Sequence, residues 1–303
     1  MTRPLDAFAA ALTFALCVVW GFNQVIAKAA LADVGPIAQT GIRSAIGVAC
    51  VVAYAMLTKR RIFRLDGTEA AGALAGLLFT VEFIALYESL RWTTAARASV
   101  FIYAAPFFVA LGAALLLKDE KPRPIQWLGL ILAFIGVAVG LIGRAPGGGW
   151  IGDMLALFAA AAWAATTIVI KATPLRRIDP VKVLLYQIGA ATLLAPVAAA
   201  ALGEPAPARV SAATVAVLAW QGIVVVGVSY VLWFRLLTRH PAAQLSAFTF
   251  VTPLVGVFAG WLTFGERVTP GFAVAIALVI AGLALVNWPR KPAASRAAPR
   301  DPE

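Results

Sequence analysis

The amino-acid sequence predicts an all-α integral membrane protein whose ten transmembrane helices form two five-helix repeats of inverted topology. Three observations lead to this fold class: a high apolar content, a series of long apolar stretches, and a set of motifs that occurs twice. Of the 303 residues, 62% are apolar and only 13% are charged, whereas soluble domains have about 45–50% and about 25%. A soluble enzyme of ordinary composition, a disordered chain and a coiled coil are therefore excluded.

Ten apolar stretches reach the length of about 20 residues that a helix needs to cross a bilayer. They cover residues 8–31, 36–58, 68–90, 93–117, 125–143, 151–172, 181–202, 212–237, 243–264 and 270–288. Short connections, several of them rich in Pro and Gly, separate the stretches. We therefore expect a first repeat at 1–143, a second at 144–288, and a disordered cytoplasmic tail at 289–303.

The basic residues outside the predicted spans are unevenly distributed between the two sides of the membrane. One side holds only Arg91, Arg144, Arg209 and Arg267, and the other side holds all the rest together with both termini. Basic connections stay in the cytoplasm, so the sequence predicts cytoplasmic termini in a bacterial inner (plasma) membrane. The net charge of +11 is then a consequence of topology, and the expected partners are a lipid bilayer and a small molecule rather than a nucleic acid.

Matching motifs occur in the same order in the two predicted repeats. They are Trp20-x7-Lys28 and Trp163-x7-Lys171, Ser99-x6-Pro106 and Ser246-x6-Pro253, Asp119-Glu120-Lys121 and Gly265-Glu266-Arg267, and Gly136 and Gly282. Because each repeat has an odd number of spans, the second enters the membrane from the opposite side. Inverted repeats of this kind favour transport by alternating access; the alternative is a duplicated structural membrane protein.

The same residues resemble a known family. The Trp-Gly-x6-Lys of the first span, the Arg of the second, and a Pro followed by a Glu-Arg or Glu-Lys turn are similar to the drug/metabolite transporter superfamily. Within it the chain resembles the EamA-type ten-helix exporters, including the YddG-like amino-acid exporters. Ala164 departs from the pattern, because it stands where the second repeat would match Gly21. The resemblance implies an exporter, with amino acids, drugs, nucleotide sugars and other metabolites as the substrates of the superfamily.

Two ionisable residues, Arg43 and Glu82, fall at similar depth within predicted spans, where a charge is costly and needs a partner or a task. Glu82 is interpreted either as a contact for a substrate amine and a protonatable coupling group, or as one half of a structural ion pair with Arg43. For Arg43 we favour the ion pair over binding of a substrate carboxylate. Lys28 and Lys171 lie near span ends and are expected to reach the membrane interface.

Aromatic and polar residues on shared helix faces predict a central cavity. Trp20 and Trp163 lie in mid-span, away from the interfacial belts where Trp is common, although helix packing also explains such positions. The predicted cavity residues are Trp20, Asn23, Phe79, Glu82, Phe83, Tyr103, Trp163, Thr167 and Tyr230.

Pro106 and Pro253 each remove a backbone donor within a predicted span. They are interpreted as symmetric hinges or gates, the alternative being fixed kinks. Three Gly-x3-Gly motifs begin at Gly72, Gly136 and Gly256. We expect them to serve internal packing in a monomer, with dimerisation as the alternative.

The function predicted from these patterns is a secondary transporter, an exporter of amino acids or related small amphipathic metabolites. Export of amphipathic drugs or cations by the same fold, a non-transport intramembrane enzyme and a structural membrane protein are the alternatives. No Walker motif is present, so ATP is not the direct energy source. With one His, and both cysteines within apolar stretches, we expect no catalytic residues, metal site or cofactor.

Overall fold

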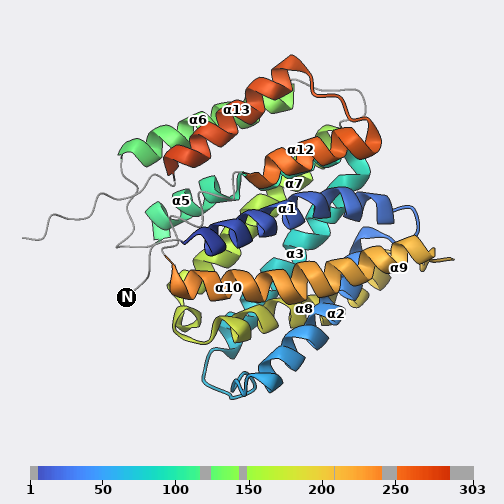
Figure 1. Ribbon diagram of the computed structural model, residues 1–303, viewed down its shortest axis with the longest axis vertical. Coiled ribbons are helices and arrows are strands. Elements are labelled where there is room, and N and C mark those ends of the chain that lie inside the picture. The colour runs from blue at the N-terminus through green and yellow to red at the C-terminus, as the bar shows by residue number, and fades with distance from the viewer. Residues whose placement is uncertain (1–5, 117–123, 143–148, 208, 241–250, 287–303) are drawn as a thin grey trace, which may run out of the picture.

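The structure, a computed structural model, describes residues 6–116, 124–142, 149–207, 209–240 and 251–286. This part of the chain is helical and has no strand. Figure 1 shows the helices side by side in one bundle, with the packed pair α6 and α13 along one edge and α2 at the opposite edge. The elements are α1 (Ala7–Ala30), α2 (Pro36–Leu57), α3 (Glu69–Trp92), α4 (Ala95–Ile102), α5 (Ala105–Leu116), α6 (Pro124–Ile142), α7 (Trp150–Ala172), η1 (Pro174–Arg177), α8 (Pro180–Ala201), α9 (Ala212–Ala219), η2 (Trp220–Ser229), α10 (Tyr230–Arg239), α12 (Val251–Phe264) and α13 (Pro270–Val286).

Seven helices in the described residues are long and apolar enough to cross a membrane. Five are α1, α2, α3, α7 and α8, and two are the composite stretches Ala95–Leu116 and Ala212–Trp233. Three shorter apolar helices, Pro124–Val139, Val251–Phe264 and Pro270–Gly282, lie where the fifth, ninth and tenth spans were predicted. The all-α membrane fold class is confirmed, whereas ten spans and inverted repeats remain predictions.

Helix starts follow from local chemistry. Pro36, Pro124, Pro180 and Pro270 are each the first residue of a helix, a position that suits the fixed φ and the missing amide of proline. At the start of α1 the Asp6 carboxylate accepts a hydrogen bond of 2.7 Å from an amide of the first turn, as an N-cap does. These signals explain why the helix starts lie within two residues of the predicted starts wherever the structure describes both.

Two helix N-termini are capped by carboxylates from distant parts of the chain. Glu204 accepts hydrogen bonds of 3.0 and 2.8 Å from two amides of the first turn of α2. Glu266 accepts bonds of 2.8 and 2.9 Å from the first two amides of α4. Conversely, a carboxylate early in the chain serves a later helix: Asp33 accepts hydrogen bonds from the amide and hydroxyl of Ser211, the residue before α9. The carboxylates supply acceptors for amides that have no partner within their own helix.

The fourth predicted span is broken into α4 and α5 at Tyr103 and Ala104. Pro106 is the second residue of α5 and has no amide hydrogen for the helical bond to the carbonyl of Ile102. The chain instead makes a tighter turn, in which the amide of Phe107 donates to the carbonyl of Ala104 over 3.0 Å. The interruption accompanies Pro106, and its role as a hinge stays a prediction.

Pro253 is the third residue of α12 and is buried. Residues 241–250, which include Ser246 of the repeat motif, lie outside the described residues. The mid-span kink expected at Pro253 therefore also stays a prediction. Asp119-Glu120-Lys121 of the repeat motifs and the predicted tail at 289–303 lie outside the described residues too.

A π-helix, η2, forms the middle of the eighth predicted span, and no sequence pattern indicated it. Two glycines of η2 face α2: a Cβ at Gly222 would collide with the Cβ of Ile46, and one at Gly227 would lie 2.7 Å from Cys50 Cβ. Real Cβ atoms do not approach so closely, so these glycines allow the two backbones to pack in direct contact.

The distribution of side chains is that expected of a protein in lipid. Large apolar residues such as Phe134, Leu193 and Trp261 are exposed, whereas polar residues such as Gln39 and Arg43 are fully buried. A bilayer accepts apolar surface and offers no hydrogen bonds to polar groups. Polar groups therefore gather inside the bundle, where the functional site has to be sought.

Candidate functional site

Arg43 lies inside the bundle on α2 and is completely buried. One terminal nitrogen of its guanidinium donates a 2.8 Å hydrogen bond to the Tyr87 hydroxyl. The guanidinium also lies over the ring of Phe83, 3.7 Å from the ring centroid, close enough for a cation–π interaction. Among the residues that the structure describes, its Nε and its other terminal nitrogen meet no hydrogen-bond partner within normal geometry, although the Tyr230 hydroxyl also interacts with the guanidinium. A buried charge is thus held by aromatic groups, with two donor nitrogens left over.

Glu82 lies on α3, 5% exposed. The structure places no hydrogen bond or ion pair between Glu82 and Arg43; the two interact only as charges at a distance. A carboxylate and a guanidinium are therefore buried in the same region, each with hydrogen-bonding capacity unused. Buried polar groups normally have partners, so the lack of partners for these two groups within the described residues makes the region a candidate site.

Polar groups of α1 adjoin Arg43. The Asn23 side-chain amide donates to the Tyr87 hydroxyl over 3.4 Å. The side-chain carbonyl oxygens of Asn23 and Gln24 are buried and accept no hydrogen bond from any residue that the structure describes. Asn23 and Arg43 share the Tyr87 hydroxyl, so an acceptor of Asn23 and two donors of Arg43 that have no partner in the described residues lie around Tyr87.

Trp20 connects α1 with η2 and α10. Its indole nitrogen donates a 2.8 Å hydrogen bond to the Ser229 hydroxyl. Its ring meets those of Trp233 and Tyr230 edge-on, with centroids 5.3 and 6.3 Å apart. Tyr230 in turn interacts electrostatically with Arg43. The structure thus brings Trp20, Asn23, Arg43 and Tyr230 into one neighbourhood.

Most of the remaining predicted residues belong to one apolar cluster. Phe79 packs on Phe83 with centroids 4.6 Å apart, and Tyr103 meets Trp163 edge-on at 5.8 Å. Phe79, Phe83 and Tyr103 are core members of the cluster, and Trp163 and Tyr230 pack against it. Thr167 is different, because its hydroxyl bonds the backbone carbonyl of Trp163 in its own helix.

Tyr87 is the residue of this region that sequence reasoning missed. It is fully buried and contacts both Arg43 and Asn23. A signal was present, because Phe79, Phe83 and Tyr87 follow each other at intervals of four and share one helix face. The prediction considered only charged partners for Arg43 and so overlooked a hydroxyl.

At one end of the bundle, Lys28 and Glu266 form an ion pair of 3.2 Å. The Lys28 ammonium also donates to the backbone carbonyl of Thr93 over 2.8 Å, and Glu266 caps α4. A Cβ at Gly260 would collide with a Glu266 carboxylate oxygen, so this approach needs glycine. We call Lys28, Thr93, Gly260, Glu266 and the first turn of α4 the Lys28 cluster; it ties α1, α4 and α12 together.

A fully buried ion pair joins Arg97 on α4 to Asp153 on α7. Asp153 accepts bonds of 2.9 and 2.5 Å from the guanidinium and one of 2.8 Å from the Thr93 hydroxyl. Gly152 allows the contact, because a Cβ there would lie 2.7 Å from the Thr93 amide. Arg97 and Asp153 lie near the starts of the fourth and sixth predicted spans, and no sequence pattern pairs them.

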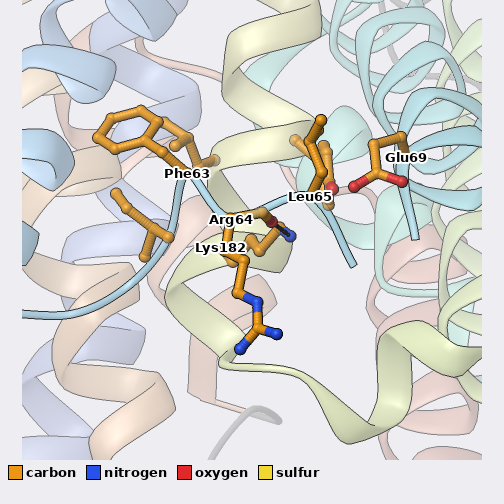
Figure 2. Close-up of a pocket in the computed structure, with 8 residues that line it drawn as sticks. Phe63, Arg64, Leu65, Glu69 and Lys182 are labelled. Atoms are coloured by element: carbon orange, nitrogen blue, oxygen red, sulfur yellow. Dashed lines mark hydrogen bonds between the residues drawn. The ribbon is translucent and has the colours of Figure 1, made fainter. Parts of the chain in front are cut away.

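The structure also contains a pocket of about 200 Å³ that shares no residue with the predicted site. Figure 2 shows Phe63 on one side and Leu65 with Glu69 on the other, with Arg64 and Lys182 between them. We call it the Arg64 pocket; it lies between the segment that links α2 to α3 and the start of α8. It is lined by Ile62, Phe63, Arg64, Leu65, Glu69, Lys182, Leu185 and Tyr186.

Comparison with known proteins identifies relatives along the whole chain. The EamA-like transporter family matches twice, over residues 7–142 and 150–288. The uncharacterized transporter YvbV of Bacillus subtilis is 28% identical over 91% of this chain and 90% of its own. Proteins named "probable amino-acid metabolite efflux pump" are 27% identical in Salmonella typhimurium, over 92% of this chain and 93% of theirs, and 26% identical in Escherichia coli, over 90% and 92%. A solved crystal structure with 20% identity has a TM-score of 0.67, over 91% of this chain and 96% of the other, and so has the same fold.

Proposed function

The chain belongs to the EamA-like transporter family, and from that membership we propose that it exports amino acids or related small amphipathic metabolites by alternating access. The resemblance inferred from the motifs is confirmed, and the protein is a membrane transporter and not an enzyme. Two relatives bear names that refer to efflux of amino-acid metabolites. Amino acids as the substrate class and alternating access as the mechanism are our proposals.

The observation that carries the proposal is the pair of buried charges with unused hydrogen-bonding capacity. The free nitrogens of Arg43 suit a substrate carboxylate, which accepts two parallel hydrogen bonds from a guanidinium. Glu82, which makes no hydrogen bond or ion pair with the described residues, suits a substrate amine or a proton. The rings of Phe79, Phe83 and Tyr230 offer an apolar surface for the rest of the molecule. A zwitterion with an apolar side chain satisfies all three requirements.

We propose further that the chain crosses the membrane ten times in two inverted halves. Reciprocal contacts between α6 and α13 support this: Gly136 packs against Val279, and Gly282 packs against Ala133. Gly136 and Gly282 are 146 residues apart, and so are Ala133 and Val279. Each residue of one contact therefore corresponds to a residue of the other contact on the opposite helix. A two-fold axis between the halves produces this relation, and rocking about the central site then exposes it to each side in turn.

Two ion pairs support a form that is closed at the end holding the Lys28 cluster. Lys28–Glu266 and Arg97–Asp153 both join the segment matched at 7–142 to the segment matched at 150–288. With cytoplasmic termini, as we propose for a bacterial inner membrane, this end faces outward. Export would then require both ion pairs to separate so that the substrate can leave.

The glycine motifs support a monomer as the transporting unit. Gly72 and Gly76 face Tyr186 of α8, and Gly256 faces Ser99 of α4. A Cβ added at any of these glycines would lie less than 3 Å from the facing residue. These close approaches use the motifs for contacts within the chain. A lipid bilayer and a small-molecule substrate are the only partners that the proposal needs.

Flux through proteoliposomes tests the proposal. Radiolabelled phenylalanine, phenylethylamine and phenylpropionate share one ring and differ in their charged groups. We expect saturable phenylalanine flux that Arg43→Gln and Glu82→Gln each reduce by about tenfold or more, since loss of a buried charged hydrogen bond costs about 1.5–3 kcal/mol. Arg91→Gln and Glu88→Gln, which alter an exposed pair on α3, serve as controls.

Each outcome is informative about the substrate. Flux of the amine alone that depends on Glu82 but not on Arg43 would replace the amino-acid proposal with amphipathic cation export. Absence of saturable flux for every amino acid in a panel, with correctly reconstituted protein, would contradict amino-acid export. A pH gradient that drives wild type but not Glu82→Gln would identify Glu82 as the proton-coupling group.

A further inference from the structure

The segment 58–68, which links α2 to α3, carries a group of exposed cations. In the described part of the chain, the side chains of Lys59, Arg61 and Arg64 are exposed and make no hydrogen bond or ion pair. Arg60 differs, because it pairs with Asp179 over 2.6 Å. Since the segment joins two membrane-spanning helices, these cations lie at a membrane surface. Clusters of Lys and Arg at such a surface attract anionic lipids.

Exposed apolar side chains alternate with these cations. Phe63 is 69% exposed and Leu65 is 81% exposed, on either side of Arg64. Met56 and Leu57 in the last turn of α2 are exposed as well. At a membrane surface, apolar side chains enter the acyl region while adjacent cations meet the headgroups. The pattern therefore favours contact with a lipid over contact with a water-soluble anion.

The Arg64 pocket lies directly beside this pattern and has a fixed floor. The Lys182 ammonium donates to the Arg64 carbonyl over 2.6 Å and to the Asp66 carboxylate over 2.8 Å. The Tyr186 hydroxyl lies 3.1 Å from that of Thr68. These bonds hold the backbone of Arg64 in place while its side chain stays exposed. Figure 2 shows Arg64 and Lys182 next to each other at the pocket.

The acidic residues near the pocket are already engaged. The Lys182 ammonium holds the pKa of Asp66 below its ordinary value, with a smaller contribution from Thr68. Glu69 accepts a 2.9 Å hydrogen bond from the Asp66 amide. The cations that remain available to an anion are Lys59, Arg61 and Arg64.

Lys59 contributes a further cation to this surface, just past the end of α2, from an unusual backbone conformation. It has φ of 53°, the left-handed conformation that glycine adopts most easily and that disfavours side chains. The amide of Arg60 donates to the carbonyl of Ala55 over 2.9 Å, as in a Schellman motif, where glycine is the usual residue. A cation stands where backbone geometry alone would select glycine.

We propose that the Arg64 pocket binds an anionic phospholipid. The phosphate group is held by Arg64 at the pocket together with Arg61 of the adjoining segment, and the glycerol and upper acyl chain lie against Phe63, Leu65 and Leu185. This inference is independent of the substrate and of the direction of transport. It assigns the pocket to a structural lipid of the bilayer rather than to the transported molecule.

Lipid binding to the purified protein in detergent tests the proposal. Native mass spectrometry and thermal unfolding would be recorded during titration with phosphatidylglycerol, phosphatidylcholine and soluble glycerol phosphate. We expect selective retention of phosphatidylglycerol with a rise in unfolding temperature. The double variant Arg61→Gln/Arg64→Gln should weaken retention about 25-fold, because each cation contributes about fivefold near an anionic surface. Arg209→Gln/Arg267→Gln, two exposed cations at the other end of the bundle, is the matched control.

The outcomes separate lipid from free phosphate and from general charge. An equal effect of the control variant, or unchanged binding by Arg61→Gln/Arg64→Gln, would overturn the assignment to this pocket. A thermal shift with glycerol phosphate equal to that with phosphatidylglycerol would overturn the lipid proposal. Phe63→Ser/Leu65→Ser keeps the cations and should also weaken phosphatidylglycerol retention; unchanged retention there would show that the apolar wall is not used. Size-exclusion profiles and helical circular dichroism verify that each variant is folded.

Discussion

Replacing Asp153 by Asn should destabilise the protein strongly, because it leaves the buried Arg97 charge without its carboxylate. The Arg97 side chain is 1% exposed and that of Asp153 is 0% exposed. Asp153 accepts three hydrogen bonds, two from the guanidinium and one from the Thr93 hydroxyl. Asn keeps one carbonyl oxygen and turns its amide donors toward groups that are themselves donors. Removal of one partner from a buried ion pair costs about 3–5 kcal/mol.

The half-exposed pair Arg60–Asp179 supplies the matched control. Its side chains are 33% and 31% exposed, and such pairs contribute about 0.2–1 kcal/mol. The free energy of unfolding would be measured in mixed detergent micelles for Asp153→Asn and Asp179→Asn. We expect a large loss for the first and a small loss for the second, with Arg97→Met/Asp153→Asn recovering part of the loss. Equal losses for the two Asn variants, or strict additivity in the double variant, would refute the reasoning.

Three further predictions concern the helix ends and the close contacts. Gly260→Ala should lower the free energy of unfolding by about 1–3 kcal/mol, because the new methyl group displaces the Glu266 carboxylate. Gly189→Ala is the control: a Cβ at Gly189 meets open space, so this change should be neutral or stabilising by up to about 1 kcal/mol. Chemical denaturation of the two variants measures the difference. Hydrogen bonds from the start of α9 lower the pKa of Asp33 to about 2. The stabilising effect of the ionised carboxylate is therefore complete above its ordinary pKa of about 4 and is lost as the pH falls toward 2. Asp33→Asn should lower the unfolding temperature at about pH 6, and the difference from wild type should disappear near pH 2. Lys59→Gly should raise the free energy of unfolding in detergent by about 0.5–1 kcal/mol by removing a side chain from the left-handed region, while an unchanged or lower value would contradict the strain argument.

The positions of the helices could be predicted from the sequence because lipid imposes a simple length requirement. The predicted span 36–58 corresponds to α2 (Pro36–Leu57), and 151–172 corresponds to α7 (Trp150–Ala172). Apolar length and a proline at the start are local signals that do not depend on the rest of the fold. The π-helix η2 could not be predicted, because a change from i+4 to i+5 bonding leaves apolar composition unchanged.

The partners of the buried charges could not be predicted to the same extent. Depth in the membrane suggested Glu82 for Arg43, yet the structure gives the guanidinium the Tyr87 hydroxyl and the Phe83 ring. Depth does not determine the rotation of a helix about its axis, so it cannot select among residues at one level. The Arg97–Asp153 pair joins positions 56 residues apart, and nothing local in the sequence connects them.

The exchange of helix caps across the chain has a consequence for how the polypeptide is made. α2 and α4 lie in the segment matched at 7–142, but their N-terminal amides are completed by Glu204 and Glu266 from the segment matched at 150–288. A nascent chain that ends before residue 204 therefore inserts two helices whose first turns have not yet met their acceptors. We therefore expect the first turns of α2 and α4 to gain their carboxylate acceptors only after residues 204 and 266 have been synthesised.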